Sequence, residues 1–198
     1  MLALIFISTY VTASISRHLY NREEIELLAS TNIVANLIAE DIKSNPKKIE
    51  EVIADVNLTS PTRIIVTDIH ARVLYDSGIN NNIKGKVFVK EEIIDAIEGK
   101  DIVSTNREKD VGSVVQAAAS IISNSETVGA VYMTNVATAT DDFIKDIKWL
   151  LNVISVIVCI LAGVLSAVMA DVVVTPIEKL TSRLSKVEFG AGAELVKF

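Results

Sequence analysis

The hydrophobic pattern of the chain is dominated by one long apolar run near its C-terminal end. Residues 149–170 contain no Asp, Glu, Lys or Arg over 22 consecutive positions. At about 1.5 Å per residue, a helix of this length spans about 33 Å, which matches a hydrocarbon core of about 30 Å. A core helix of a soluble protein usually keeps a polar face, so the run predicts a transmembrane helix.

A second uncharged segment occupies residues 1–16. As a helix it would reach only about 24 Å, which is short for a full span. A cleaved signal peptide is the alternative, but such a peptide begins with basic residues and this segment has none. We expect a first transmembrane helix that is truncated at its start, and the sequence leaves open whether it is retained or cleaved.

The segment between these runs begins with the spacing of a long helix. Seven residues fall on one helical face, at intervals of one, three and four: Leu27, Leu28, Thr31, Val34, Ala35, Ile38 and Ile42. Ile33 and Leu37 lie off this face, so they pack either inside the domain or against a second copy of the chain. Pro46 is tolerated at the first position of a helix and marks the start of a second, shorter one.

The pattern then changes to the alternation that is typical of strands. A tight turn at His70 and Ala71 joins the first two strands, and a short helix at residues 90–100 follows them. A charged helix from Asp141 leads into the apolar run. This order predicts an α+β fold in which helices flank a five-stranded antiparallel sheet. The five expected strands are residues 63–69, 72–77, 101–106, 111–123 and 126–137.

Composition narrows the classes of function. Half of the residues are hydrophobic but only 5% are aromatic, which suits aliphatic membrane segments. Residues 17–148 hold 15 Lys and Arg against 21 Asp and Glu, which accounts for the whole net charge of −6. This acidic balance argues against a nucleic-acid partner, which a basic patch would favour. The single cysteine, Cys159, leaves no disulfide framework and no cysteine metal site.

Two stretches of the central segment resemble a known family. The sequence IIVTDIHARVLYDSG (64–78) resembles the first hairpin of the extracytoplasmic PAS-like, or Cache, sensor domains of bacterial receptors. The sequence IIDAIEGKDIVS (93–104) resembles the helix and strand that follow that hairpin. The usual Asp-Gly turn of the family is replaced here by Ile-His-Ala. The resemblance covers about residues 20–145, and it implies a ligand that sits against the sheet, lined by the later strands.

The segment after the apolar run has a rhythm of its own. Pro176 lacks an N–H group, so it loosens the helix as the chain leaves the bilayer. The stretch TPIEKLTSRLSKVEFG (175–190) resembles the first helix of a HAMP linker. That resemblance implies a parallel four-helix bundle in a homodimer, in which Pro176 and the apolar seam relay the signal. A plain amphipathic helix on the membrane surface is the alternative. Intervals of four and three define the seam as Val173, Ile177, Leu180, Leu184 and Val187.

No residues stand in a recognisable catalytic arrangement, and we expect no cofactor in this chain. His18 is expected at the membrane interface and His70 in a turn. Asp68, His70 and Asp76 are too loosely spaced to predict a metal site, so we expect none. The polar side chains that could line a ligand site are Tyr75, Arg107, Gln116, Tyr132 and Asn135.

These features predict four parts: a truncated transmembrane helix (1–16), a sensor domain (17–148), a second transmembrane helix (149–170) and an incomplete first HAMP helix (171–198). The resemblance implies the input part of a bacterial two-component sensor histidine kinase. Such a protein is a multi-pass homodimer of the cell membrane that senses an extracytoplasmic ligand or stimulus and signals to a response regulator. A chemotaxis receptor or a membrane cyclase receptor is the alternative. The chain lacks phosphoacceptor and ATP-binding modules, and neither ligand nor output is predicted.

Overall fold

The helices and strands follow one another in the order that the sequence predicts, except that the first predicted helix ends at Ile38 and Ile42 lies in a separate short helix. The computed structural model describes residues 2–44, 46–56, 62–78, 82–109, 111–170 and 172. The predicted start of the last helix at Asp141 is three residues late, because the Asp141 amide already closes a helical turn on the Ala137 carbonyl at 2.9 Å. The elements are α1 (Leu2–Ile38), α2 (Asp41–Ser44), α3 (Pro46–Asp55), β1 (Thr62–Asp68), β2 (Val73–Asp76), α4 (Glu91–Ile97), β3 (Ile102–Glu108), β4 (Gly112–Ser123), β5 (Glu126–Val136) and α5 (Thr138–Met169).

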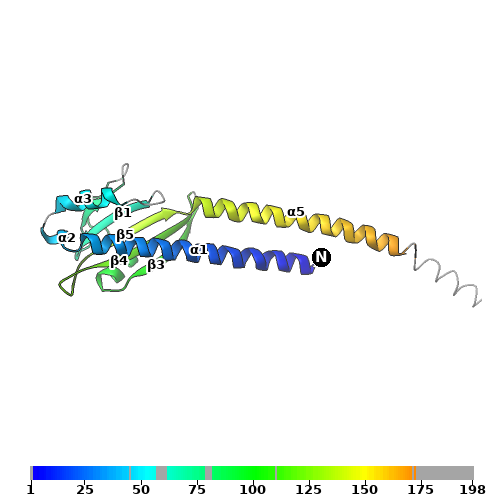
Figure 1. Cartoon of the computed structure of the whole chain (residues 1–198), viewed down its shortest axis with the longest axis horizontal. Coiled ribbons are helices and arrows are strands. Elements are labelled where there is room, and N and C mark those ends of the chain that lie inside the picture. The colour runs from blue at the N-terminus through cyan, green and yellow to red at the C-terminus, as the bar shows by residue number, and fades with distance from the viewer. Residues whose placement is uncertain are drawn as a thin grey trace, which may run out of the picture. The chain divides into compact units, whose positions relative to one another are not determined.

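The five strands form one antiparallel sheet in the order β2-β1-β5-β4-β3 (Figure 1). The three later strands make a meander, and β5 also pairs with β1, so that the last strand lies at the centre. In this register, Tyr132 on β5 lies opposite Ile65 on β1 and, on its other side, opposite Ala118 on β4. The α+β fold with a five-stranded antiparallel sheet is therefore confirmed.

One face of the sheet is covered by α1, α2 and α3. The predicted helical face of α1 packs there, since Leu27, Val34, Ala35 and Ile38 join a core cluster with the strands. Ile33 and Leu37 instead remain 57% and 51% exposed, so packing inside the domain does not account for them. Because side chains alternate along a strand, the sheet contributes every second residue to this cluster, except at Val128, which lies beyond a register shift of the β4–β5 pair. These sheet residues are Ile64, Val66, Val115, Ala117, Ala119, Ile121, Val128, Val131 and Met133.

The opposite face of the sheet is covered by the short helix α4. Its buried residues, Ile93 and Ala96, pack against the intervening positions of the strands. Two of these positions are alanines, Ala118 and Ala130, which allow α4 to approach the sheet closely. The strand residues of this second cluster are Ile65, Val73, Ala118, Ala130 and Tyr132.

The turn of the first hairpin is formed as predicted. Ala71 adopts a positive φ of 55°, a conformation that usually favours Gly or Asn. Asp68 stabilises the turn because its carboxylate accepts hydrogen bonds from the amides of His70 (2.8 Å) and Arg72 (2.9 Å). This carboxylate explains how Ile-His-Ala can replace an Asp-Gly turn.

The chain divides into two compact units, each described by itself. Residues 11–146 contain the sheet, and residues 1–10 with 147–198 form the other unit. Within the described residues, α5 is the one helix long and apolar enough to cross a membrane, with a mean hydropathy of 2.6. The first transmembrane helix expected at residues 1–16 stays a prediction. The HAMP-like seam, with Pro176, lies outside the described residues.

Candidate functional site

A cluster of three polar side chains lies between α4 and the sheet. Lys90 Nζ donates hydrogen bonds to the hydroxyl of Tyr132 at 2.9 Å and to Oε1 of Gln116 at 3.1 Å. The Tyr132 hydroxyl donates to the same Gln116 oxygen at 2.9 Å. We call these three residues the Lys90 cluster. It is built by β4, β5 and the residue that precedes α4.

Strand pairing positions the cluster. Gln116 lies opposite Thr134, and Tyr132 lies opposite Ala118, so the two side chains are diagonal neighbours on adjacent strands. Both project toward α4, because Gln116 lies two residues from Ala118 on β4 and Tyr132 two residues from Ala130 on β5, and both alanines pack in the cluster beneath α4. Lys90 stands at the N-terminal boundary of α4 in an extended conformation, with φ −132° and ψ 154°. Its backbone therefore lies outside the helix, and its side chain reaches over the sheet.

The ammonium group of Lys90 is held without a carboxylate partner in the described part of the chain. No Asp or Glu oxygen of that part lies within 4.0 Å of Lys90 Nζ, the distance that would make an ion pair. The Tyr132 ring offers a cation–π contact instead, with Nζ 5.1 Å from its centroid. Phe88 packs against the same ring edge-on, at a centroid distance of 5.9 Å. A lysine can donate three hydrogen bonds, and two of them are used within the cluster.

Burial determines the protonation of Tyr132. Its residue exposure is 2%, and burial raises the pKa of the phenol above its usual value, although the hydrogen bond from Lys90 opposes the shift. The hydroxyl therefore stays protonated at neutral pH and remains a donor to Gln116.

A second pair of polar residues borders the cluster on the same side. The hydroxyl of Ser104 on β3 donates to Glu92 Oε1 on α4 at 3.1 Å. Ser104 pairs with Gln116 in the β3–β4 register, so it lies directly beside the Lys90 cluster. A carboxylate and an ammonium group thus flank the same part of the sheet, which would suit a ligand with both an acceptor and a donor.

A buried ion pair fixes the neighbouring strands. Arg63 on β1 binds Asp76 on β2 through Nε (2.9 Å) and Nη2 (2.8 Å). The Asp76 side chain is fully buried and also accepts the amides of Gly78 and Ile83, both at 2.9 Å. Burial alone would raise the pKa of Asp76, but Arg63 and the two amides outweigh it and hold the pKa below its usual value. We assign this pair to the structure of the hairpin and its following loop.

The structure unites only two of the five predicted liners. Gln116 and Tyr132 belong to the Lys90 cluster, whereas Asn135 projects from β5 toward the α1 face. Tyr75 packs against the α1-side core. Arg107 is exposed on the edge strand β3. These three residues therefore do not share one site with Gln116 and Tyr132, and their contact with a ligand stays a prediction.

Asn135 has an environment of its own. It is 7% exposed, and its Oδ1 is buried without a hydrogen-bond donor in the described part of the chain. Asn135 lies opposite Val115, a member of the α1-side core. Asn135 lies three residues from Tyr132 along β5, an odd number, so its side chain projects to the opposite face of the sheet from the Lys90 cluster.

Sequence analysis missed Lys90, Phe88, Glu92 and Ser104. Lys90 was recognised only as the start of a helix, where a lysine is usually a solvated surface residue. One available signal was the alternation along residues 112–136, which identifies Gln116 and Tyr132 as polar residues on one buried face. A partner for them had to come from the helix that covers that face.

Neither a family model nor a curated protein matches the chain. Solved structures do resemble it. The sensor domain of DcuS from E. coli is 16% identical, with a TM-score of 0.44, over 62% of this chain and 94% of that one. The sensor domain of the histidine kinase DctB from V. cholerae is 15% identical, with a TM-score of 0.37, over 69% of this chain and 52% of that one.

A third similar structure is the ligand-binding domain of the amino acid chemoreceptor PctC from Pseudomonas aeruginosa, in complex with GABA. It is 12% identical, with a TM-score of 0.48, over 74% of this chain and 66% of that one. The first two of these structures are described as sensor domains and the third as a ligand-binding domain. The chain spans about half to two thirds of the length of the DctB and PctC domains, and at these identities the similarity concerns the fold alone.

Proposed function

We propose that this chain is the input part of a bacterial sensor histidine kinase, whose sheet domain binds a small anionic ligand at the Lys90 cluster. The observation that carries the ligand site is the ammonium group of Lys90, held by Gln116 and Tyr132 without a carboxylate among the described residues. A partly buried charge is stabilised by a counter-ion, and a carboxylate or similar group on a ligand would supply it.

The covering helix α4 gives the ligand a route to the rest of the domain. Lys90 immediately precedes α4, and Glu92 in its first turn is bound to Ser104 on β3. A ligand that binds Lys90 would compete with the contacts to Gln116 and Tyr132. It would therefore alter how α4 and strands β4 and β5 are held together, and β5 continues through Ala137 into α5.

We assign the relay of the signal to the helices at the C-terminal end of the chain. Helix α5 runs without interruption from Thr138 to Met169, so a displacement at its start can reach the apolar part. The predicted HAMP helix and its homodimer would convert that displacement into altered helix packing in a kinase module. A coupling free energy of about 1–3 kcal/mol is enough to change the ratio of two states many-fold.

Ligand titration tests the site. The full chain in lipid nanodiscs would be titrated with a panel of mono- and dicarboxylic acids and amino acids, and binding followed by calorimetry and by thermal shift. We expect at least one member to bind the wild type and to lose about tenfold or more in affinity with Lys90→Met, because hydrogen bonds to charged groups contribute about 1.5–3 kcal/mol. Lys86→Met, an exposed lysine nearby, is the matched control and should bind normally.

Two results would contradict the assignment. Binding that survives Lys90→Met unchanged would place the ligand elsewhere, and binding of no panel member would remove the proposed ligand class. ATP-dependent autophosphorylation of the purified chain would show that it is more than an input part. A chemotaxis receptor shares the same input organisation, and the coding frame after Phe198 distinguishes the two classes by a phosphoacceptor histidine or a long coiled coil.

A further inference from the structure

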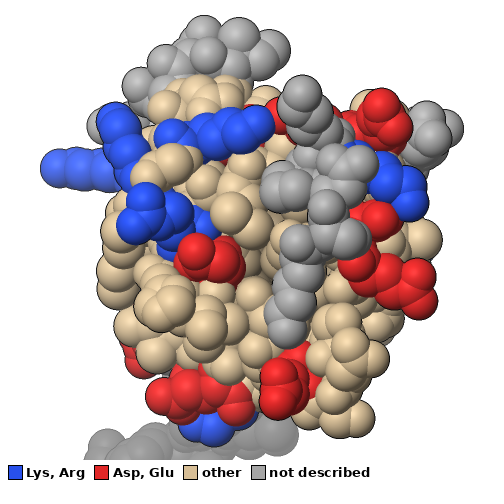
Figure 2. Space-filling model, turned by 90° about the vertical axis from the view of Figure 1, so that its left-hand side faces the viewer, with Lys and Arg blue, Asp and Glu red and all other residues tan. Residues whose placement is uncertain are grey.

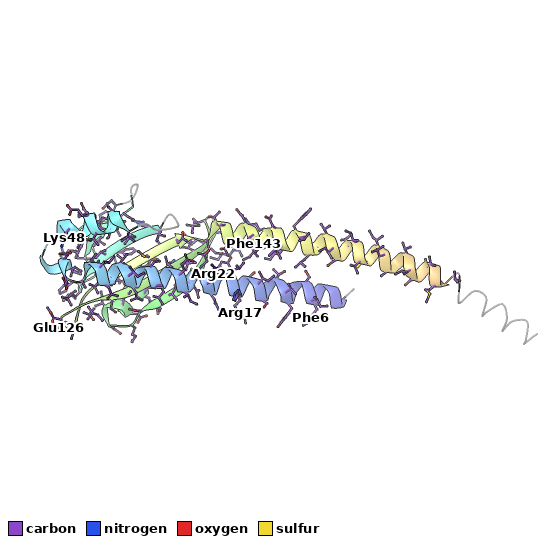
Figure 3. All side chains as sticks on the ribbon, in the orientation of Figure 1. Phe6, Arg17, Arg22, Lys48, Glu126 and Phe143 are labelled. Atoms are coloured by element: carbon purple, nitrogen blue, oxygen red, sulfur yellow. The ribbon has the colours of Figure 1, made fainter. Side chains whose placement is uncertain are left out.

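A network of hydrogen bonds joins α1, the start of β4 and the first turn of α5. The amide and hydroxyl of Ser113 donate to the carboxylate of Asp141, at 2.8 Å and 2.9 Å. The hydroxyl of Tyr20, on α1, also donates to Asp141, and its oxygen lies 3.0 Å from that of Ser113. Three elements far apart in the sequence thus converge on one carboxylate. Arg22 on α1 and Phe143 on α5, each two residues from a member of this network, are labelled in Figure 3.

Two flanking contacts reinforce the convergence of α1 with its neighbours. The hydroxyl of Thr140 in α5 donates to Glu23 at 2.9 Å, and the hydroxyl of Thr105 in β3 donates to Glu24 at 2.6 Å. Each of the two consecutive glutamates of α1 therefore reaches a different element. The network is not a single contact that a side-chain rotation would abolish.

The backbone at the start of β4 is shaped to fit Asp141. Gly112 has a φ of 101°, and a Cβ at this position would lie 2.8 Å from Asp141 Oδ2. Only glycine combines that conformation with so close an approach. The Ser113 carbonyl also accepts the amide of Ala137 at 2.9 Å, which anchors the residue that precedes α5.

Strand β4 links this network with the Lys90 cluster. Ser113 and Gln116 are three residues apart on β4, about 10 Å along a strand, and their side chains project to opposite faces of the sheet. The strand lies between β3 and β5 and is hydrogen-bonded to both. A shift of Gln116 on the α4 face would therefore be carried along the strand to Ser113 on the α1 face.

We propose that Tyr20, Ser113 and Asp141 form a latch that couples the Lys90 cluster to the first turns of α5. The latch holds α5 in register with α1 and β4, and a displacement of β4 pulls directly on Asp141. Ligand state would then set how firmly the base of α5 is held. This inference rests on the proposed sensing role of the Lys90 cluster and specifies the contacts through which that role reaches the helix.

Hydrogen exchange of the full chain in lipid nanodiscs tests the latch, with the amides of residues 141–146 as the readout. Asp141→Asn and Tyr20→Phe should each accelerate their exchange, by about tenfold for Asp141→Asn, because it weakens hydrogen bonds to a charged acceptor. Asp142→Asn is the matched control, since the one ion pair of Asp142 among the described residues is with the exposed Lys145, at 2.8 Å. It should change the exchange by less than about threefold. Equal effects of Asp141→Asn and Asp142→Asn would overturn the latch.

A double-mutant comparison separates coupling from simple packing. Lys90→Met should alter exchange at residues 141–146 in the wild-type background, by about threefold or more, and should have little effect in a Tyr20→Phe background. Additive effects, or no effect of Lys90→Met in the wild type, would contradict the inference. Ligand titration remains independent: binding lost with Lys90→Met together with additive exchange would refute the latch and leave the sensor proposal intact.

Discussion

The ion pair of Arg63 and Asp76 makes a quantitative prediction about the stability of the sheet domain. Replacing Asp76 by Ala removes the acceptor of four hydrogen bonds between 2.8 and 2.9 Å. The Asp76 side chain is 0% exposed, whereas that of Arg63 is 35% exposed. The two partners therefore respond differently to the substitution.

The magnitude follows from which donors are left without a partner. Arg63 can turn toward water, so the loss of its hydrogen bonds to Asp76 contributes little after solvent screening. The amides of Ile83 and Gly78 lose their acceptor, and an unsatisfied buried donor costs about 1–3 kcal/mol. Two such amides together give about 2–6 kcal/mol, so we expect the free energy of unfolding to fall by about 4 kcal/mol.

Urea unfolding of the full chain in detergent micelles measures this loss. Hydrogen exchange at the fully buried Val66 and Val131, in the central strands, would report unfolding of the sheet rather than of α5. Glu50→Ala is the matched control, because Glu50 pairs with Lys84 on the surface, with side-chain exposures of 54% and 51%. The control should cost less than about 1 kcal/mol. Equal losses for the two variants would refute the argument from burial.

Three further predictions concern stability. Gly129→Ala should destabilise the domain by about 3 kcal/mol, measured by the same unfolding, because its Cβ would lie 2.1 Å from the Thr67 carbonyl oxygen. Ile38→Ala should lower the free energy of unfolding by about 2–5 kcal/mol, because Ile38 is 0% exposed. Ile33→Ala should lower it by well under about 1 kcal/mol, because Ile33 is 57% exposed. A larger loss at Ile33 that depends on protein concentration would reveal a second copy packed there. Asp76 and Asp141 have lowered pKa values, each against the opposing effect of burial, so their stabilisation is complete above the unfolded pKa of about 4 and is lost as pH falls below it. Asp76→Asn should flatten that acid limb of the stability curve.

Local periodicity was sufficient to predict the strands, the other helices and their order, but it placed Ile42 in the first helix rather than in the separate helix α2. The predicted turn at His70–Ala71, and the short interval between the strands predicted at residues 111–123 and 126–137, also indicate which strands pair when they are adjacent in sequence. Pairing of β1 with β5 joins residues more than sixty positions apart, and no local pattern specifies it. The central position of β5 had to come from the structure.

The candidate site was only partly predictable for a related reason. Alternation along β5 already places Tyr132 and Asn135 on opposite faces, so one site could not have contained both. Lys90 could not be identified, because its role depends on α4 covering β4 and β5. On the face drawn in Figure 2, several Lys and Arg side chains gather at the upper left, whereas most Asp and Glu side chains lie below them or to the right.

Cysteine labelling in intact bacterial cells tests the central claim, that α5 crosses the bilayer and the sheet domain lies outside the cytoplasm. In a Cys159→Ser background, Glu126→Cys places a thiol at the exposed start of β5. A membrane-impermeant maleimide should label it without permeabilisation, while Cys159 of the wild type should stay unlabelled in the membrane. Labelling of Glu126→Cys only after permeabilisation, or a wild-type chain that is soluble without detergent, would contradict the account.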